Sequence, residues 1–315
     1  MENLIKVRQK TKKGFQNEDW PSNYLEKIPC PLCKSTSYKK LYPKVYRRIV
    51  KCSKCNLILT NPRLKKRYLK HLYSEEYFNN TNSSHFGYEN YLADEEKIVR
   101  TFKKRVEAIE KVVLKKGKML DIGCATGFFM KAARDNKWRV EGIEISEYAA
   151  SYAKEHFGFK VYSKDFLTLS LPEKTYDVIT LWDVIEHFNN PTAALIKIRK
   201  LLKPNGILVL STPDVNSIPA NLTGSKWVGY KLSDEHLTYF SIKTMTNLLE
   251  KTGFSVVKKS HIGKHVSLPM LSDRASIYSP ILGKLINLIG RLLPKSYFIY
   301  INPFDIMCIY AKRAE

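Results

Sequence analysis

Residues 118–127 read Lys-Met-Leu-Asp-Ile-Gly-Cys-Ala-Thr-Gly and have the residue types of a nucleotide-binding turn. An apolar run ends at the acidic Asp121, and Gly123 and Gly127 follow before a helical pattern begins. Glycine lets the backbone turn tightly and approach a ligand, because it carries no Cβ. A strand, a glycine-rich turn and a helix N-terminus together form a nucleotide site. The dinucleotide fingerprint Gly-x-Gly-x-x-Gly is not matched, because Ala125 takes the place of its middle glycine.

A second acidic residue, Glu144, lies near the end of the strand-like run 140–145, about 20 residues beyond the turn. At that separation a carboxylate can accept hydrogen bonds from both hydroxyls of a ribose. The alternative is a solvated acid at the end of a strand. We expect the ribose role, because the predicted fold and the spacing agree.

Together, Asp121-Ile-Gly-Cys-Ala-Thr-Gly127 and Glu144 resemble the motifs of the class I S-adenosylmethionine (SAM) methyltransferases. The resemblance implies that the turn passes under the methionine and ribose portions of SAM. It also implies that Asp165 accepts a hydrogen bond from the adenine amino group and that the Phe166 ring packs on the adenine. The cofactor-binding residues implied in this way are Asp121, Gly123, Cys124, Gly127, Phe128, Glu144, Ile145, Asp165, Phe166 and Asp183.

Asp183, Glu186 and His187 follow the fourth predicted strand, and His236 lies further along the chain. The arrangement resembles the ubiquinone-pathway catechol O-methyltransferases and the RNA 3′-terminal ribose O-methyltransferases, whose matching residues hold a divalent ion. We expect Glu186, His187 and His236 to be catalytic. The four side chains either hold Mg²⁺ or Mn²⁺, or provide a metal-free general base at His187 or His236, or are structural.

Four cysteines form the pattern C-x₂-C, eighteen residues, C-x₂-C, namely Cys30, Cys33, Cys52 and Cys55. Two such pairs bring four thiolates within tetrahedral reach of one zinc ion. Two disulfides or four unrelated thiols are the alternatives. A bridge inside a C-x₂-C pair is uncommon in structural sites, and the first residues lack a long apolar signal segment. We therefore expect a structural zinc and a cytoplasmic protein.

Strand and helix patterns alternate from about residue 88 to 262, which predicts a parallel sheet with right-handed crossovers. We expect an α/β protein with a Rossmann-like seven-stranded methyltransferase core and a small N-terminal zinc-ribbon module. The family resemblance places the last strand, 305–312, antiparallel to the sixth, and residues 203–206 are predicted to be a turn. The expected segments are a basic tail (1–25), the zinc ribbon (26–62), a helical linker and cap (63–117), the SAM-binding core (118–262), an amphipathic helical insertion (263–303) and the last core strand (304–315).

Within the insertion, the apolar residues from Ile281 to Leu293 have helical spacing. This helix either packs on the core or on a second copy, or it lies on a membrane surface or covers a lipid-linked substrate. It is too short and too charged to span a bilayer.

The net charge of +23 is concentrated in the N-terminal part of the chain. Such a basic head suits RNA, anionic lipid headgroups or phosphate-linked sugars, or is a solvated surface. The run Ile49–Arg63 is similar to the zinc-ribbon head of a bacterial and archaeal methyltransferase group, many of whose members are associated with cell-surface polysaccharide or modified-sugar pathways. The resemblance implies O-methylation of a sugar or surface-glycan precursor. RNA methylation and a non-catalytic binding module are the alternatives, as is peripheral contact with the inner membrane surface.

Overall fold

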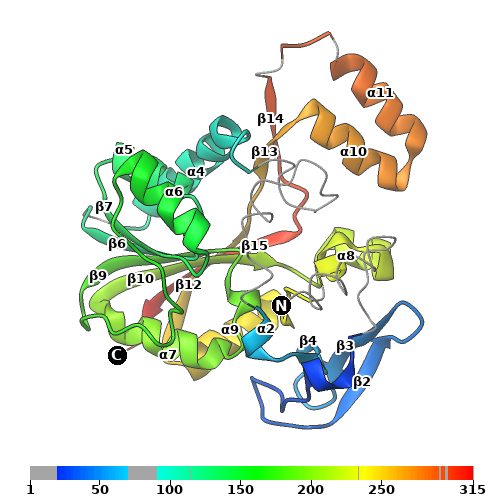
Figure 1. The fold of residues 1–315 in the computed structure, drawn as a ribbon, viewed down its shortest axis with the longest axis horizontal. Coiled ribbons are helices and arrows are strands. Elements are labelled where there is room, and N and C mark those ends of the chain that lie inside the picture. Colours follow the sequence, from blue (N-terminus) through cyan, green and yellow to red (C-terminus); the bar gives the residue numbers. More distant parts are fainter. Residues whose placement is uncertain are drawn as a thin grey trace.

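The computed structural model describes residues 20–69, 91–113, 115–232, 234–290, 292–294 and 297–314. Most of the expected basic tail, residues 1–19, lies outside this part of the chain. The centre of the molecule is a seven-stranded sheet with the order β12-β15-β10-β9-β6-β7-β8 (Figure 1). Its strands are β6 (Lys118–Ile122), β7 (Arg139–Ile143), β8 (Val161–Tyr162), β9 (Tyr176–Trp182), β10 (Leu202–Pro213), β12 (Phe254–His261) and β15 (Ile306–Arg313).

Strand β15 is antiparallel to both of its neighbours, β10 and β12. The pairs β6–β7, β6–β9, β7–β8 and β9–β10 are parallel. The predicted Rossmann-like core, with its last strand beside the sixth, is therefore confirmed.

The turn predicted at residues 203–206 is wrong, because strand β10 already begins at Leu202. Its register against β9 shifts between Leu202 and Ile207. Pro204 has no backbone N–H to give to a ladder, and the residues between Leu202 and Ile207 bulge out of the pairing with β9 inside the strand.

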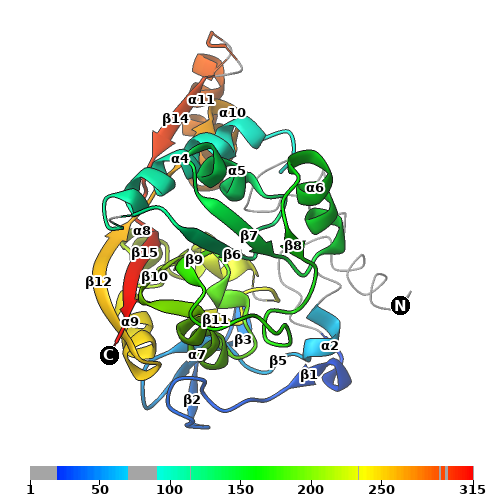
Figure 2. The same ribbon diagram turned by 90° about the vertical axis from the view of Figure 1, so that its left-hand side faces the viewer.

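Helices cover both faces of the sheet (Figures 1 and 2). One face carries α4 (Glu95–Glu110), α5 (Phe128–Asp135) and α6 (Glu147–Phe157), and the other carries α7 (Pro191–Leu201) and α9 (Ile242–Lys251). Residues from β9 and β10 contribute to two apolar clusters, one with α4 and α5 and one with α7 and α9. This two-sided burial explains why these strands are apolar without alternation.

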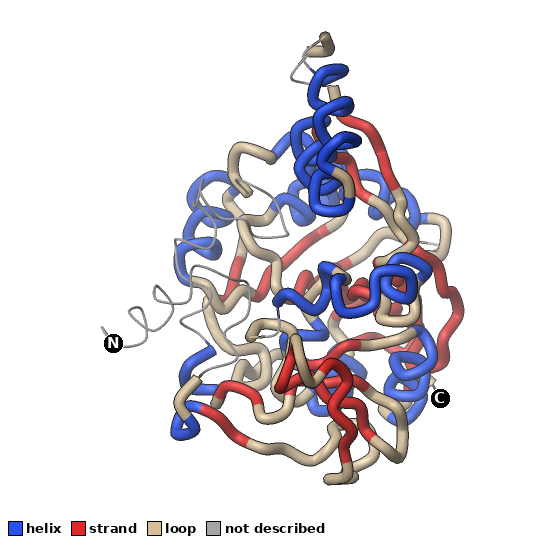
Figure 3. The backbone as a smooth tube through the Cα atoms, turned by 90° about the vertical axis from the view of Figure 1, so that its right-hand side faces the viewer, coloured by secondary structure: helices blue, strands red, loops and turns tan. Residues whose placement is uncertain are grey.

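The cysteine-rich module is joined to the core by a shared sheet. Strands β2 (Tyr38–Tyr42), β3 (Tyr46–Cys52) and β4 (Ile58–Thr60) continue into the core strand β11 (Thr238–Tyr239). Figure 3 shows these strands together at the base of the molecule. The remaining elements around this junction are η1 (Ser22–Tyr24), β1 (Leu25–Glu26), β5 (Arg63–Leu64), α2 (Lys66–Leu69), η3 (Ile185–His187), α8 (Ile218–Thr223), η4 (Gly224–Lys226) and η5 (Val228–Leu232).

The insertion before the last core strand is a helical hairpin on a two-stranded ribbon. Strands β13 (Lys264–Ser267) and β14 (Phe298–Ile301) pair antiparallel, and α10 (Leu268–Tyr278) and α11 (Pro280–Gly290) lie between them in the sequence. The hairpin projects from the body of the molecule (Figure 1).

Candidate active site

The glycine-rich turn connects β6 to α5 in a left-handed conformation that only small residues adopt readily. Gly123 has φ 73° and Gly127 has φ 86°. A Cβ on Gly123 would lie 2.5 Å from Cγ2 of Val184, the second residue after β9. The turn is therefore packed directly against the segment that follows β9.

Asp121, at the end of β6, is buried and accepts a hydrogen bond from the Thr180 hydroxyl at 2.7 Å. Burial, together with the neighbouring Glu144, raises the pKa of this carboxyl to about 8, against the opposing hydrogen bond from Thr180. Such a raised pKa is typical of carboxyls that are held out of water at ligand sites.

Glu144, which follows β7, forms a hydrogen bond with the glycine-rich turn. Its Oε2 accepts the Ala125 N–H at 2.9 Å, and its Oε1 accepts the Ser146 N–H at 2.8 Å. The side chain is only 7 % exposed, and burial raises the pKa of its carboxyl. Each carboxylate oxygen has two lone pairs, so both oxygens keep one for a ligand hydroxyl.

The other residues expected at the cofactor differ in exposure. The Ile145 side chain is 46 % exposed, and Asp165 forms an ion pair with Lys66 at 2.7 Å. Cys124 and Phe128 are buried, Cys124 in a cluster with Met130.

Phe166, whose ring is expected to pack on an adenine, has a buried side chain. It is 3 % exposed and belongs to the apolar cluster beneath α7 and α9. The Lys197 ammonium lies 4.9 Å from the ring centroid and also donates to the Phe166 carbonyl. Phe166 is therefore part of the core, and the Lys197 ammonium lies over its ring.

Three of the four residues expected around the acceptor come together. Ligand atoms of Glu186, His187 and His236 lie within 4.8 Å of one another. Both imidazoles are oriented by backbone carbonyls: His187 Nδ1 is 2.9 Å from the Glu235 oxygen, and His236 Nδ1 is 3.2 Å from the Gly229 oxygen. A carbonyl can only accept, so each Nδ1 carries the hydrogen and each Nε2 keeps its lone pair.

Glu186 is almost fully buried, and neither of its carboxyl oxygens has a hydrogen-bond partner among the residues described. Burial and the nearby Asp183 raise its pKa well above the usual value. Burial lowers the pKa of His187 to about 4 and that of His236 to about 3. Two neutral imidazoles and an unpartnered carboxyl are a donor set that fits a divalent cation.

Asp183 is not a member of this cluster. Its Oδ1 accepts a hydrogen bond from the Ser211 hydroxyl at 2.8 Å, and its backbone has φ 56°. A positive φ is unusual for a residue with a side chain, because it costs energy. Residues with such backbone strain are frequent at functional sites.

Sequence analysis missed the residues that hold His236 in place. The Thr60 hydroxyl donates to the His236 carbonyl at 3.0 Å, and the Leu237 N–H donates to the Glu186 carbonyl at 2.9 Å. Arg48 forms an ion pair with Asp234 at 2.5 Å. No motif marks these contacts, because they join positions more than forty residues apart.

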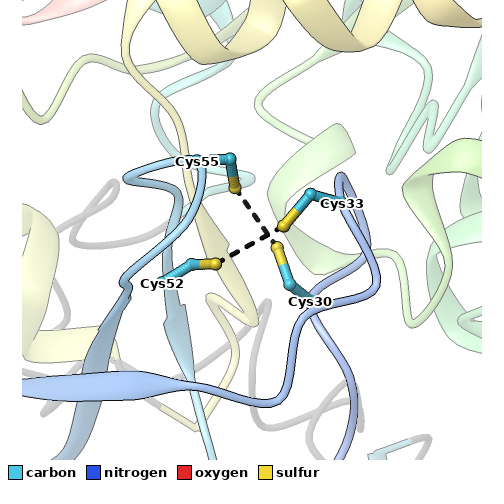
Figure 4. Close-up of side chains that lie close together, drawn as sticks. All are labelled: Cys30, Cys33, Cys52 and Cys55. Atoms are coloured by element: carbon cyan, nitrogen blue, oxygen red, sulfur yellow. Dashed lines mark hydrogen bonds between the residues drawn. The ribbon is translucent and has the colours of Figure 1, made fainter.

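The four cysteines of the ribbon converge on one point (Figure 4). The sulfur atoms of Cys30 and Cys55 are 3.5 Å apart, as are those of Cys33 and Cys52. A tetrahedral zinc with Zn–S bonds of about 2.3 Å requires S–S separations of roughly 3.8 Å. The four thiols therefore fit a zinc ion.

Comparison with known proteins identifies the class. A family model described as a methyltransferase domain matches residues 92–259. The chain belongs to this family, and its core is that of a class I SAM-dependent methyltransferase.

Among curated proteins, the ubiquinone biosynthesis O-methyltransferase of Coxiella burnetii is 30% identical over 118 residues, which cover 36% of this chain and 50% of that protein. The chain thus spans about half the length of the curated relatives that it matches.

Two solved structures share the fold. One belongs to a complex between the Haloferax volcanii Trm112 methyltransferase activator and a methyltransferase, with TM-score 0.52, 16% identity and coverage of 71% and 92% of the two chains. The other is geranyl diphosphate C-methyltransferase from Streptomyces coelicolor, with TM-score 0.50, 16% identity and coverage of 79% and 96%.

Proposed function

We propose that the protein is an O-methyltransferase that acts on a hydroxyl group of a sugar or a cell-surface glycan precursor. The observation that carries the proposal is the cluster of Glu186, His187 and His236. It begins two residues after Val184, which packs against Gly123 of the cofactor turn. A site whose proposed cation would lower the pKa of an acceptor hydroxyl thus lies in the segment that packs against the donor turn.

The cofactor half of the site follows from the turn. We propose that Asp121, Gly123, Gly127, Glu144, Ile145, Asp165 and Asp183 bind SAM, with Glu144 on the ribose. Cys124, Phe128 and Phe166 would contribute through their backbone, since their side chains are buried. SAM supplies a methyl group made electrophilic by its sulfonium, so the protein has to align the acceptor and exclude water.

In the acceptor half, we propose that Glu186, His187 and His236 hold a divalent cation. Such a cation lowers the pKa of an acceptor hydroxyl. A metal-free base at His187 has less support, because a buried imidazole with a pKa of about 4 binds a proton weakly. In the ribbon, we propose a structural zinc on the four cysteines.

The sugar-type acceptor is supported by the likeness of the ribbon and core to methyltransferases of surface-polysaccharide pathways, and an oxygen acceptor by the name of the curated relatives. RNA is the second candidate acceptor. It is favoured by the exposed lysines of the ribbon, Lys39, Lys40 and Lys54.

The experiment measures methyl transfer from labelled SAM to nucleotide-linked and lipid-linked sugars, with and without EDTA and competitor RNA. We expect transfer that RNA does not inhibit and that falls at least about 100-fold with EDTA or with His187→Ala. The exposed His156→Ala is the matched control and should retain full activity. Turnover that survives EDTA but not His187→Ala would replace the cation by a base. Salt-sensitive transfer to RNA alone would overturn the sugar proposal.

A further inference from the structure

We propose that the α10–α11 hairpin docks on the surface of an anionic lipid membrane through the apolar face of α11. This property is separate from methyl transfer and does not depend on the identity of the acceptor. Large apolar side chains line the outer face of α11 and continue beyond its end. They are Ile281 (73 % exposed), Leu282, Leu285 (54 %), Leu288 (60 %), Ile289 and Leu292 (82 %).

The hairpin is displayed away from the rest of the molecule. The β13–β14 ribbon carries it out from the edge of the body, and α10 and α11 project beyond the helices that cover the sheet (Figures 1 and 2). Helix α11 packs mainly on α10. The outer face of α11 is therefore open to whatever partner approaches the projecting end.

The two helices approach each other closely at small residues. Gly283 faces α10, where the Ser272 hydroxyl donates to its carbonyl at 2.9 Å. A Cβ on Gly283 would lie 1.8 Å from the Ser276 hydroxyl oxygen, and one on Gly290 would lie 3.2 Å from Cβ of Leu268. Gly283 and Gly290 thus allow close contact between α11 and α10, beside the buried Leu268, while most of the large apolar residues of α11 are exposed.

An amphipathic helix in water buries its apolar face against its neighbour. Helices in lipid do the reverse, because hydrocarbon solvates large apolar side chains while small residues allow close helix contact. The arrangement of α10 and α11 follows the lipid pattern. This argues for a membrane as the occupant of the exposed face rather than a polar protein surface.

The positive charge of the hairpin and of the whole chain indicates an anionic membrane. Residues 268–297 include four Lys or Arg and one Asp, and the whole chain carries +23. Along the ribbon, the Lys104 ammonium lies 4.3 Å from the Tyr300 ring centroid, and the Arg100 guanidinium lies 5.5 Å from that of Phe298, at the end next to the hairpin. Basic and aromatic side chains in such positions favour anionic headgroups.

The depth of contact is limited by length. Helix α11 has eleven residues and is therefore about 16 Å long. Within the described residues, no helix has the length and hydropathy needed to cross a bilayer. The hairpin therefore engages one leaflet, as interfacial amphipathic helices do.

The experiment is flotation of the full chain with vesicles of phosphatidylcholine alone or with roughly 30 % phosphatidylglycerol. We expect binding to the anionic vesicles and at least about a 10-fold weaker partition for the double variant Leu285→Glu/Leu288→Glu. Leu222→Glu is the matched control, because Leu222 is 82 % exposed on α8, outside the hairpin. It should float as the wild type does.

Three outcomes would overturn the proposal. They are no binding to either vesicle, equal binding by wild type and double variant, and a wild-type dimer in light scattering that the double variant abolishes without any vesicle binding. The last outcome would assign the face to a second copy of the chain. Unchanged SAM affinity in the double variant shows that its core is folded, so the result stands apart from the test of methyl transfer.

Discussion

At the scale of single residues, two buried carboxyls organise the donor side of the site. Asp121 and Glu144 lie at the ends of adjacent parallel strands, β6 and β7. Glu144 accepts backbone N–H groups from the turn and from the start of α6, so the same carboxylate that we propose for the ribose also shapes the turn. Asp121 is held by a hydroxyl and by burial.

Replacing Glu144 with alanine should weaken SAM binding at least about 10-fold. The change removes the proposed ribose acceptor and two hydrogen bonds that hold the turn. Isothermal titration with SAM measures the effect, and Glu147→Ala, an exposed acid of the same helix start, serves as the control. A Kd equal to that of the wild type would show that the cofactor assignment is mistaken.

The raised pKa of Asp121 predicts a pH dependence of stability. The carboxyl binds its proton more tightly in the folded state, with a pKa of about 8 against an ordinary value of 3.8. Its contribution to folding is fully present below about pH 3.8 and is lost as the pH rises through about 8.

The Asp121→Asn variant does not lose stability in this way as the pH rises, because an amide does not ionise. From pH 5 to pH 9, the free energy of unfolding should shift in favour of the variant by a few kcal/mol, on the order that linkage allows. Urea denaturation at both pH values measures the shift, with the half-exposed Asp135→Asn as the control. An identical difference between variant and wild type at both pH values would contradict the burial argument.

At the scale of elements, strand β4 of the ribbon and strand β11 of the core form one antiparallel pair. The pair fixes the segment that carries His236, and Thr60 at the end of β4 donates to the His236 carbonyl. The ribbon is therefore part of the proposed acceptor side of the site. The pairing also gives a structural reason for a metal-binding module at the N-terminus of this chain.

Thr60→Val keeps the shape of the side chain and removes the hydroxyl. We expect a loss of about 1 kcal/mol in stability, because a buried carbonyl loses its partner. Turnover should fall while SAM affinity stays unchanged, since the contact lies on the acceptor side. Thr175→Val removes an exposed hydroxyl bond remote from the site and is the control. Equal losses in SAM affinity and turnover would assign Thr60 a general structural role.

The elements also show what periodicity can and cannot predict. Helix α4 lies within the predicted helical linker and cap (63–117), and β12 lies within the predicted core (118–262). The turn at 203–206 was predicted because Pro204 and Gly206 are ordinary turn residues. These residues instead lie inside β10, which pairs with β9 at Leu202 and again from Ile207. One amphipathic helix was expected in the insertion, and α10 was missed because its apolar spacing is weak.

At the scale of the whole molecule, ribbon and core share one apolar cluster. Cys30, Cys52 and Leu57 belong to the same cluster as Phe240 and Met245 of the core. Further contacts cross the boundary, including the Thr192 hydroxyl to the Pro31 carbonyl at 3.0 Å. We therefore expect ribbon and core to unfold together.

Metal analysis should find about one zinc per chain. Cys30→Ser should lose it and lower the melting temperature of the entire protein by at least about 10 °C, in a single transition. Lys54→Ser, an exposed change between two of the ligands, should retain both zinc and stability. A variant in which the core melts at the wild-type temperature would show that the ribbon is an independent unit.

The sequence by itself determined the chemistry of the donor side and of the ribbon, because those motifs are local. The turn from Asp121 to Gly127 and the two C-x₂-C pairs act through neighbours a few residues away, so spacing alone predicts them. The sequence also named Glu186, His187 and His236, but only the tertiary structure showed that they meet and that Thr60 holds the His236 backbone, because these contacts arise through sheet pairing between distant segments. The tertiary structure also decided which face of α11 is exposed, since periodicity defines an apolar face but not the element that covers it.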